Sequence, residues 1–137
     1  MSTRVSTAWV QGLLAILFFV LVGELSVQFN EYVFHRLGIN RTAFMSVLWA
    51  LPVAAAFIAA RYSKQNKLLA GMSYAILLPL LGSLAHFVSG ELGGPVDFAG
   101  VRGAVVTFKI YLVLAVLTTG LGTALGVAFS PTEATGA

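Results

Sequence analysis

Four side chains that can hold a proton, an ion or a polar solute recur at helical spacing near the N-terminus: Glu24, Gln28, Glu31 and His35. Their offsets of i, i+4, i+7 and i+11 place all four within about a 60° arc of one helix face. The residues between them are mostly apolar, and Gly38 is a plausible helix end. The pattern predicts a helix that continues to about Leu37 and carries a polar stripe.

Glu24 is the member of this stripe that we expect inside a membrane. Trp9 is expected to anchor the helix at the interface, and the 15 residues from Trp9 to Glu24 span about 22 Å of helix. This length is shorter than the hydrocarbon thickness of ~30 Å, and an intramembrane carboxylate is costly unless it faces a partner or water. The position favours a proton-binding or substrate-binding role, with a structural ion pair as the alternative.

The other polar residues offer partners or alternatives to this site. His86 and Lys109 are expected in the same half of the membrane as Glu24, where a lysine ammonium would stabilise the carboxylate. Lys109 has a second interpretation, in which its stem extends to the interface. Glu31 and His35 are expected near the headgroups, where packing in the interface would explain them equally well.

No cofactor is predicted, although two histidines leave one alternative open. Haem b held by His35 and His86 is that alternative, since both are expected near the outer ends of their helices. A metal site is not predicted, because the four-residue spacing of Glu31 and His35 lacks a fuller ligand set. No nucleophile–base motif occurs, so the sequence does not indicate an enzyme.

The composition identifies the class of protein that must position these residues. Of the 137 residues, 58% are hydrophobic and 9% are charged, whereas a soluble domain has roughly 25% charged residues. This balance argues against a soluble enzyme, a soluble binding module and a disordered chain. A net charge of +3 spread along the chain does not suggest a nucleic-acid partner, and the absence of cysteine excludes thiol catalysis and disulfides.

The sequence therefore predicts an all-α integral membrane protein with the lipid bilayer as its main partner. We expect a single domain over 1–137, with four transmembrane helices in a small antiparallel bundle and the first helix extended beyond the bilayer. Continuous apolar runs of spanning length carry this prediction. The expected spans are about 9–30, 42–61, 68–88 and 103–129.

Prolines and glycines within these spans predict how the helices bend and pack. Pro52 and Pro79 fall mid-span and are expected to kink the second and third helices. Gly122 and Gly126 form a GxxxG pattern, which lets helices approach closely. Close packing within one bundle and self-association into a homo-oligomer are both compatible with this pattern.

Flanking charges give a weak preference for the topology. Four spans put both termini on one side, and the cations divide evenly between the two sides. The basic turn at 61–67 favours the cytoplasm for its own side, and acidic residues accompany the cations on the other side. We expect an inner or plasma membrane protein with cytoplasmic termini, while dual topology stays open.

Three functions fit these features. The leading hypothesis is a small polytopic transporter or channel, proton-coupled through Glu24 and built as a homo-oligomer. The first alternative is a non-catalytic anchoring or accessory subunit that associates with other membrane subunits. The second alternative is a haem-binding membrane anchor.

Overall fold

The computed structural model describes residues 7–64, 66–94 and 100–130, and the elements within them are all helices. They are α1 (Thr7–Gln28), the π-helix η1 (Tyr32–Arg36), α2 (Arg41–Tyr62), α3 (Lys67–Met72), α4 (Tyr74–Glu91) and α5 (Gly100–Ala128). Four segments are long and apolar enough to cross a membrane, namely α1, α2, α3 with α4, and α5. The prediction of an all-helical chain with four such segments is confirmed.

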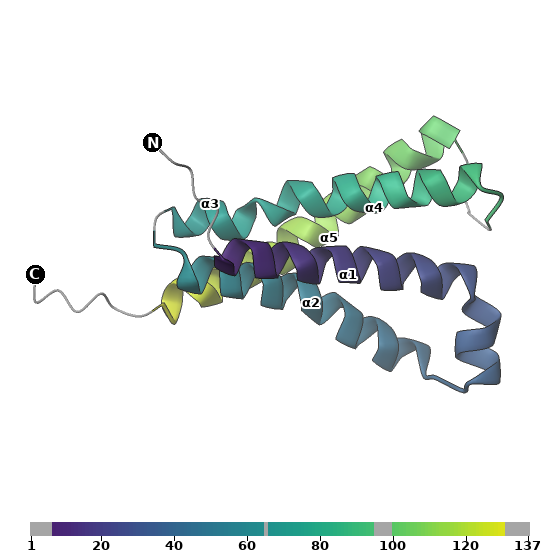
Figure 1. Ribbon diagram of the computed structural model, residues 1–137, viewed down its shortest axis with the longest axis horizontal. Helices are drawn as coiled ribbons and strands as arrows, with labels where there is room; N and C mark the ends of the chain where they lie inside the picture. Colours follow the sequence, from purple (N-terminus) through teal and green to yellow (C-terminus); the bar gives the residue numbers. More distant parts are fainter. Residues whose placement is uncertain (1–6, 65, 95–99, 131–137) are drawn as a thin grey trace, which may run out of the picture.

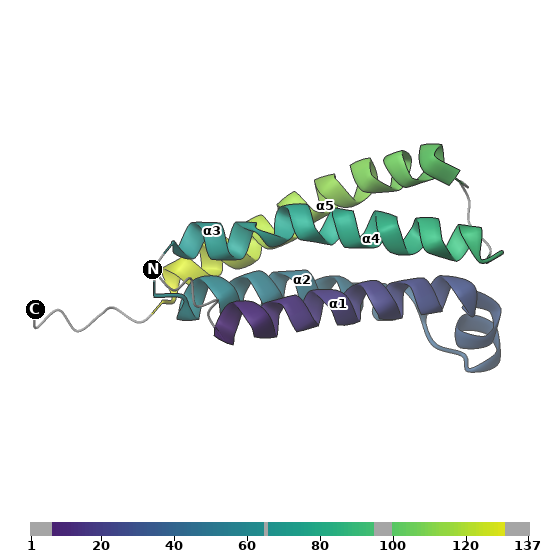
Figure 2. The same cartoon turned by 45° about the horizontal axis from the view of Figure 1, so that its top comes forward.

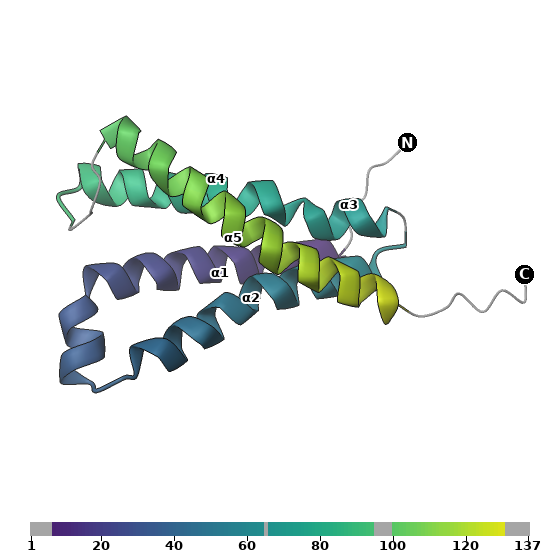
Figure 3. The ribbon, with the colours of Figure 1, turned by 180° about the vertical axis from the view of Figure 1, so that it is seen from behind.

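The long helices run side by side and alternate in direction (Figure 1). The start of α1, the turn between α2 and α3, and the end of α5 lie together at one end of the molecule. The other end carries η1 and the end of α4. Seen from behind, α5 crosses over α2, while α2 diverges from α4 and α5 toward the η1 end (Figure 3). Figure 2 shows α1 lying along α2. In the view of Figure 1, α1 lies between α2 and α4.

Helical residues continue to Arg36, close to the predicted end near Leu37, but they do not form one straight helix. The chain turns after Gln28 and continues as η1, which packs back on the start of α2 (Figure 2). The side chain of Asn30 accepts a hydrogen bond from Arg41, and the rings of Phe34 and Phe44 meet edge to face at 5.5 Å. These contacts with α2 redirect the chain after α1. Helical periodicity cannot show such a turn, because it assumes one straight helix.

Local residues explain where α2 begins. The side chain of Asn40 accepts a hydrogen bond from the N–H of Ala43 at 3.1 Å, which caps the helix. Gly38 takes a φ of +68°, a conformation that glycine adopts without strain and that lets the chain reverse before the cap. α2 then runs without a break through the buried Pro52.

The third apolar segment is two helices rather than one. It is interrupted at Ser73, six residues before Pro79. Proline lacks an N–H and its ring crowds the carbonyl four residues earlier, which for Pro79 is that of Ala75 inside α4, so the proline does not by itself place the break. Ser73 fixes the break, since its hydroxyl donates to the carbonyl of Ala70 and accepts from the indole N–H of Trp9 at 2.8 Å.

The core lies where α2, α4, α5 and α1 come closest. Small residues let the backbones approach there, because a Cβ added at Gly122 would lie 2.2 Å from the carbonyl oxygen of Val53. A Cβ added at Gly126 would lie 2.6 Å from the carbonyl oxygen of Phe57. Larger side chains fill the remaining space and form one cluster, which includes Ile16, Phe19, Leu48, Tyr74 and Leu78.

Candidate functional site

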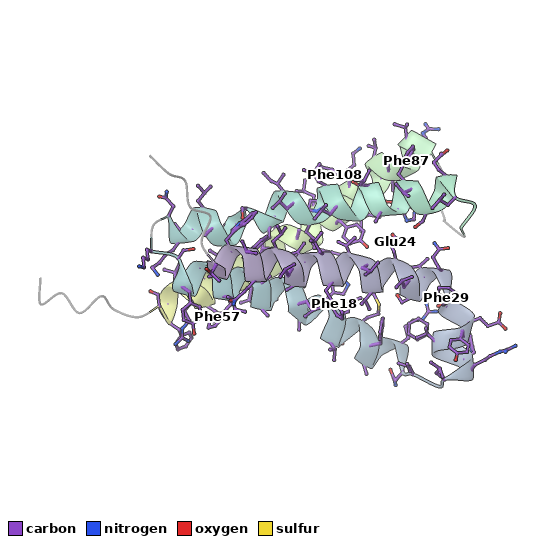
Figure 4. All side chains as sticks on the ribbon, viewed as in Figure 1. Phe18, Glu24, Phe29, Phe57, Phe87 and Phe108 are labelled. Atoms are coloured by element: carbon purple, nitrogen blue, oxygen red, sulfur yellow. The ribbon has the colours of Figure 1, made fainter. Side chains whose placement is uncertain are left out.

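Among the described residues, one carboxylate and one imidazole lie close enough to form an ion pair when the imidazole is protonated. They are Glu24 and His86, from neighbouring helices. Oε1 of Glu24, on α1, lies 3.6 Å from Nδ1 of His86, on α4. The side chains are 12% and 15% exposed, respectively. Figure 4 shows Glu24 on the side of α1 that faces α4. A separation of 3.6 Å is a charge contact rather than a hydrogen bond.

The second carboxylate oxygen of Glu24 has its own partner. The hydroxyl of Ser89 donates to Oε2 at 3.2 Å, so both oxygens of Glu24 face α4. Ser89 follows His86 by three residues, and this spacing puts both side chains on one face of α4. The sequence argument missed Ser89, although the same i, i+3 periodicity from His86 would have found it.

Gln28 lies one helical turn beyond Glu24 and packs against the backbone that follows α4. A Cβ added at Gly94 would lie 2.3 Å from Oε1 of Gln28, so the glycine permits this close approach. The amide Nε2 of Gln28 is buried without a hydrogen-bond partner among the described residues, as is Nε2 of His86. Two buried polar nitrogens therefore lie on the residues that adjoin the carboxylate.

Tyr111 is a further neighbour that the sequence argument missed. Its ring packs on α4, where a Cβ added at Gly82 would lie 3.3 Å from three ring carbons. Its hydroxyl lies within electrostatic range of Glu24. The ring of Trp49, on α2, lies 5.9 Å from that of Tyr111. No spacing in the sequence relates Tyr111 to Glu24, since their electrostatic interaction depends on how α5 packs.

Glu31 and His35 do not join Glu24 in the structure. Both side chains are exposed, because the chain turns after α1 and His35 lies in η1. An open hollow of about 270 Å³ at this turn is lined by Gln28, Phe29, Glu31, Tyr32 and Arg36. Of the predicted stripe, only Glu24 and Gln28 therefore lie between α1 and α4.

Lys109 also lies away from the pair. Its side chain is exposed on α5, and it forms no ion pair with a described residue. His35 and His86 occupy different settings, one exposed on η1 and one largely buried beside Glu24, and no described contact joins them.

The arrangement of Glu24, His86 and Ser89 can hold and exchange a proton. A carboxylate with an imidazole 3.6 Å away and a hydroxyl on its other oxygen can bind a proton or a polar solute at either group.

Comparison of the chain with protein-family models, with curated proteins and with solved structures finds no match.

Proposed function

We propose that the protein is a small integral membrane transporter that couples solute movement to protons through Glu24. In this proposal α1, α2, α3 with α4, and α5 cross the membrane as an antiparallel four-helix bundle. The observation that supports the proposal is the Glu24–His86 pair, which joins two of the apolar helices and is largely shielded from solvent.

The position of the pair along the helices supports exchange with one side of the membrane. Glu24 precedes the last residue of α1 by four residues, and His86 precedes the last residue of α4 by five. These offsets correspond to about 6–8 Å of helix. A proton or solute entering from the η1 end would therefore cross only a short distance to reach the carboxylate.

The chemistry of the site suggests how the coupling would work. With Glu24 ionised, a protonated His86 and the hydroxyl of Ser89 stabilise its negative charge. A proton on Glu24 weakens the attraction to His86 and frees the imidazole for a solute. The buried Nε2 atoms of His86 and Gln28 are then available for hydrogen bonds to that solute. We infer a small polar solute, since the two α4 side chains that contact the carboxylate, His86 and Ser89, are both hydrogen-bonding groups.

Glu24→Gln tests this function. The variant keeps the size and polarity of the side chain but cannot ionise, so it should abolish proton-coupled transport while the helical content is retained. The measurement is proton flux in everted membrane vesicles, followed with a pH-sensitive dye as candidate polar solutes are added. Glu31→Gln is the matched control, because Glu31 is exposed on the same segment, and it should transport like the unmodified chain.

Full activity of Glu24→Gln would contradict the assignment. The accessory-subunit alternative makes the opposite prediction, in which Glu24→Gln is tolerated and the protein is recovered from its host membrane with other chains. Native mass spectrometry of gently extracted protein distinguishes the two, since the transporter proposal expects copies of this chain alone.

A further inference from the structure

Two cations lie on one exposed face of α5. Arg102 and Lys109 are seven residues apart, which places their side chains within about 20° of each other around the helix. Both side chains are exposed, and neither forms an ion pair with a described residue. Glu24, the nearest candidate partner suggested by the sequence, is engaged by His86 instead.

The remainder of this face is apolar and equally uncovered. Val105, Val113 and Val116 lie along the same stripe and are 48%, 61% and 46% exposed, respectively. α5 contains no acidic residue. The face therefore has two positive charges toward the N-terminal end of the helix, with one exposed valine between them and two beyond them.

The direction of the side chains brings the two charges together. Lys109 lies about 10 Å from Arg102 along the axis. Side chains on a helix lean toward its N-terminus, so the stem of Lys109 extends over the turn that holds Val105 and toward Arg102. The charged end of a lysine in this setting reaches the interface while its stem covers apolar surface.

We propose that this face of α5, formed by Arg102, Val105, Lys109, Val113 and Val116, binds an anionic phospholipid. The lipid phosphate would lie between the guanidinium of Arg102 and the ammonium of Lys109, and an acyl chain would pack along the valines. Charge complementarity selects this occupant, because a second copy of α5 would bring two further cations and no carboxylate. The proposal does not depend on the transport function.

Native mass spectrometry of delipidated protein in mild detergent tests this lipid site. The protein is titrated with dioleoyl phosphatidylglycerol and, separately, with dioleoyl phosphatidylcholine, which carries the same chains but no net charge. We expect a preference for phosphatidylglycerol that falls roughly five- to thirtyfold in R102Q/K109Q, the range expected for losing one to two cations near a membrane surface.

Two matched variants separate the site from net charge and from folding. R36Q/K64Q also removes two exposed cations, but elsewhere on the molecule, and should keep the preference. R102K/K109R retains both charges and should keep the preference for phosphatidylglycerol. This variant still tests the site if R102Q/K109Q does not fold. An equal loss in R36Q/K64Q, or an unchanged preference in R102Q/K109Q, would overturn the site. So would a dimer of the unmodified chain that R102Q/K109Q abolishes, since a second copy would then cover this face.

Discussion

Glu24 and His86 interact where water screens their charges poorly. Each side chain is less than one-sixth exposed, and Ser89 binds the carboxylate from the same helix as His86. Removing one partner leaves the other with an unbalanced polar group in a site of low dielectric constant. The interaction energy between Glu24 and His86 is therefore the property to measure at the residue scale.

A double-mutant cycle measures that energy. We expect Glu24→Gln and His86→Gln to be non-additive by about 0.5–3 kcal/mol in free energy of unfolding, because the residues contact each other directly. The measurement is reversible unfolding in mixed detergent micelles, followed by circular dichroism. Glu31→Gln and His35→Gln form the control cycle, since that exposed pair should couple by less than about 0.5 kcal/mol. Additive effects at Glu24 and His86 would contradict a coupled pair.

Sequence reasoning reached part of this site. The depth argument selected Glu24, and the antiparallel order of the helices brought His86 near it. The same reasoning also grouped Lys109, Glu31 and His35 with them, because periodicity gives a helix face but not the turn after Gln28 or the rotation of α5. Tyr111 was missed for the same reason, since its electrostatic interaction with Glu24 depends on how α5 packs.

At the scale of the helix, glycine determines how closely α2 and α5 approach. Gly122 and Gly126 both face backbone carbonyls of α2, at Val53 and Phe57. The GxxxG pattern is thus used inside this chain, one of the two roles its sequence permitted. A carbonyl oxygen cannot rotate away as a side chain can, so added volume must push the helices apart.

Gly122→Ala is therefore expected to destabilise the protein by about 1–3 kcal/mol, since its Cβ would lie 2.2 Å from the carbonyl oxygen of Val53. Gly120→Ala is the matched control on the same helix, because an added Cβ meets nothing within 4 Å. It should be neutral or stabilising by up to about 1 kcal/mol, as alanine favours helix over glycine. Thermal unfolding in detergent compares the two, and equal stabilities would contradict the close crossing.

The helices themselves were easier to predict than their interruptions. Long apolar runs located all four segments, because length and hydropathy are properties of the chain alone. The break at Ser73 was not predicted, since Ser73 binds Trp9 from another helix. A proline indicates that a helix will be weakened, whereas this break lies at Ser73, whose hydroxyl binds the carbonyl of Ala70.

At the scale of the whole molecule, charge differs between the two ends. The end with the α2–α3 turn carries Arg61, Lys64 and Lys67, and no acidic residue of the described chain accompanies them. The η1 end mixes cations with Glu31 and Glu91. Cytoplasmic loops are enriched in lysine and arginine, so this asymmetry favours the α2–α3 turn on the cytoplasmic side.

Cysteine labelling tests this orientation cleanly because the chain has no cysteine of its own. Asn66→Cys probes the α2–α3 turn, while His35→Cys and Leu92→Cys probe the η1 end; all three positions are exposed, and none removes a lysine or arginine. In intact cells an impermeant maleimide should label positions 35 and 92 but not 66, and permeabilisation should expose 66. Labelling of position 66 alone in intact cells would show the opposite orientation. Labelling of all three in intact cells would indicate dual topology, in which the near balance of flanking charge leaves both orientations populated.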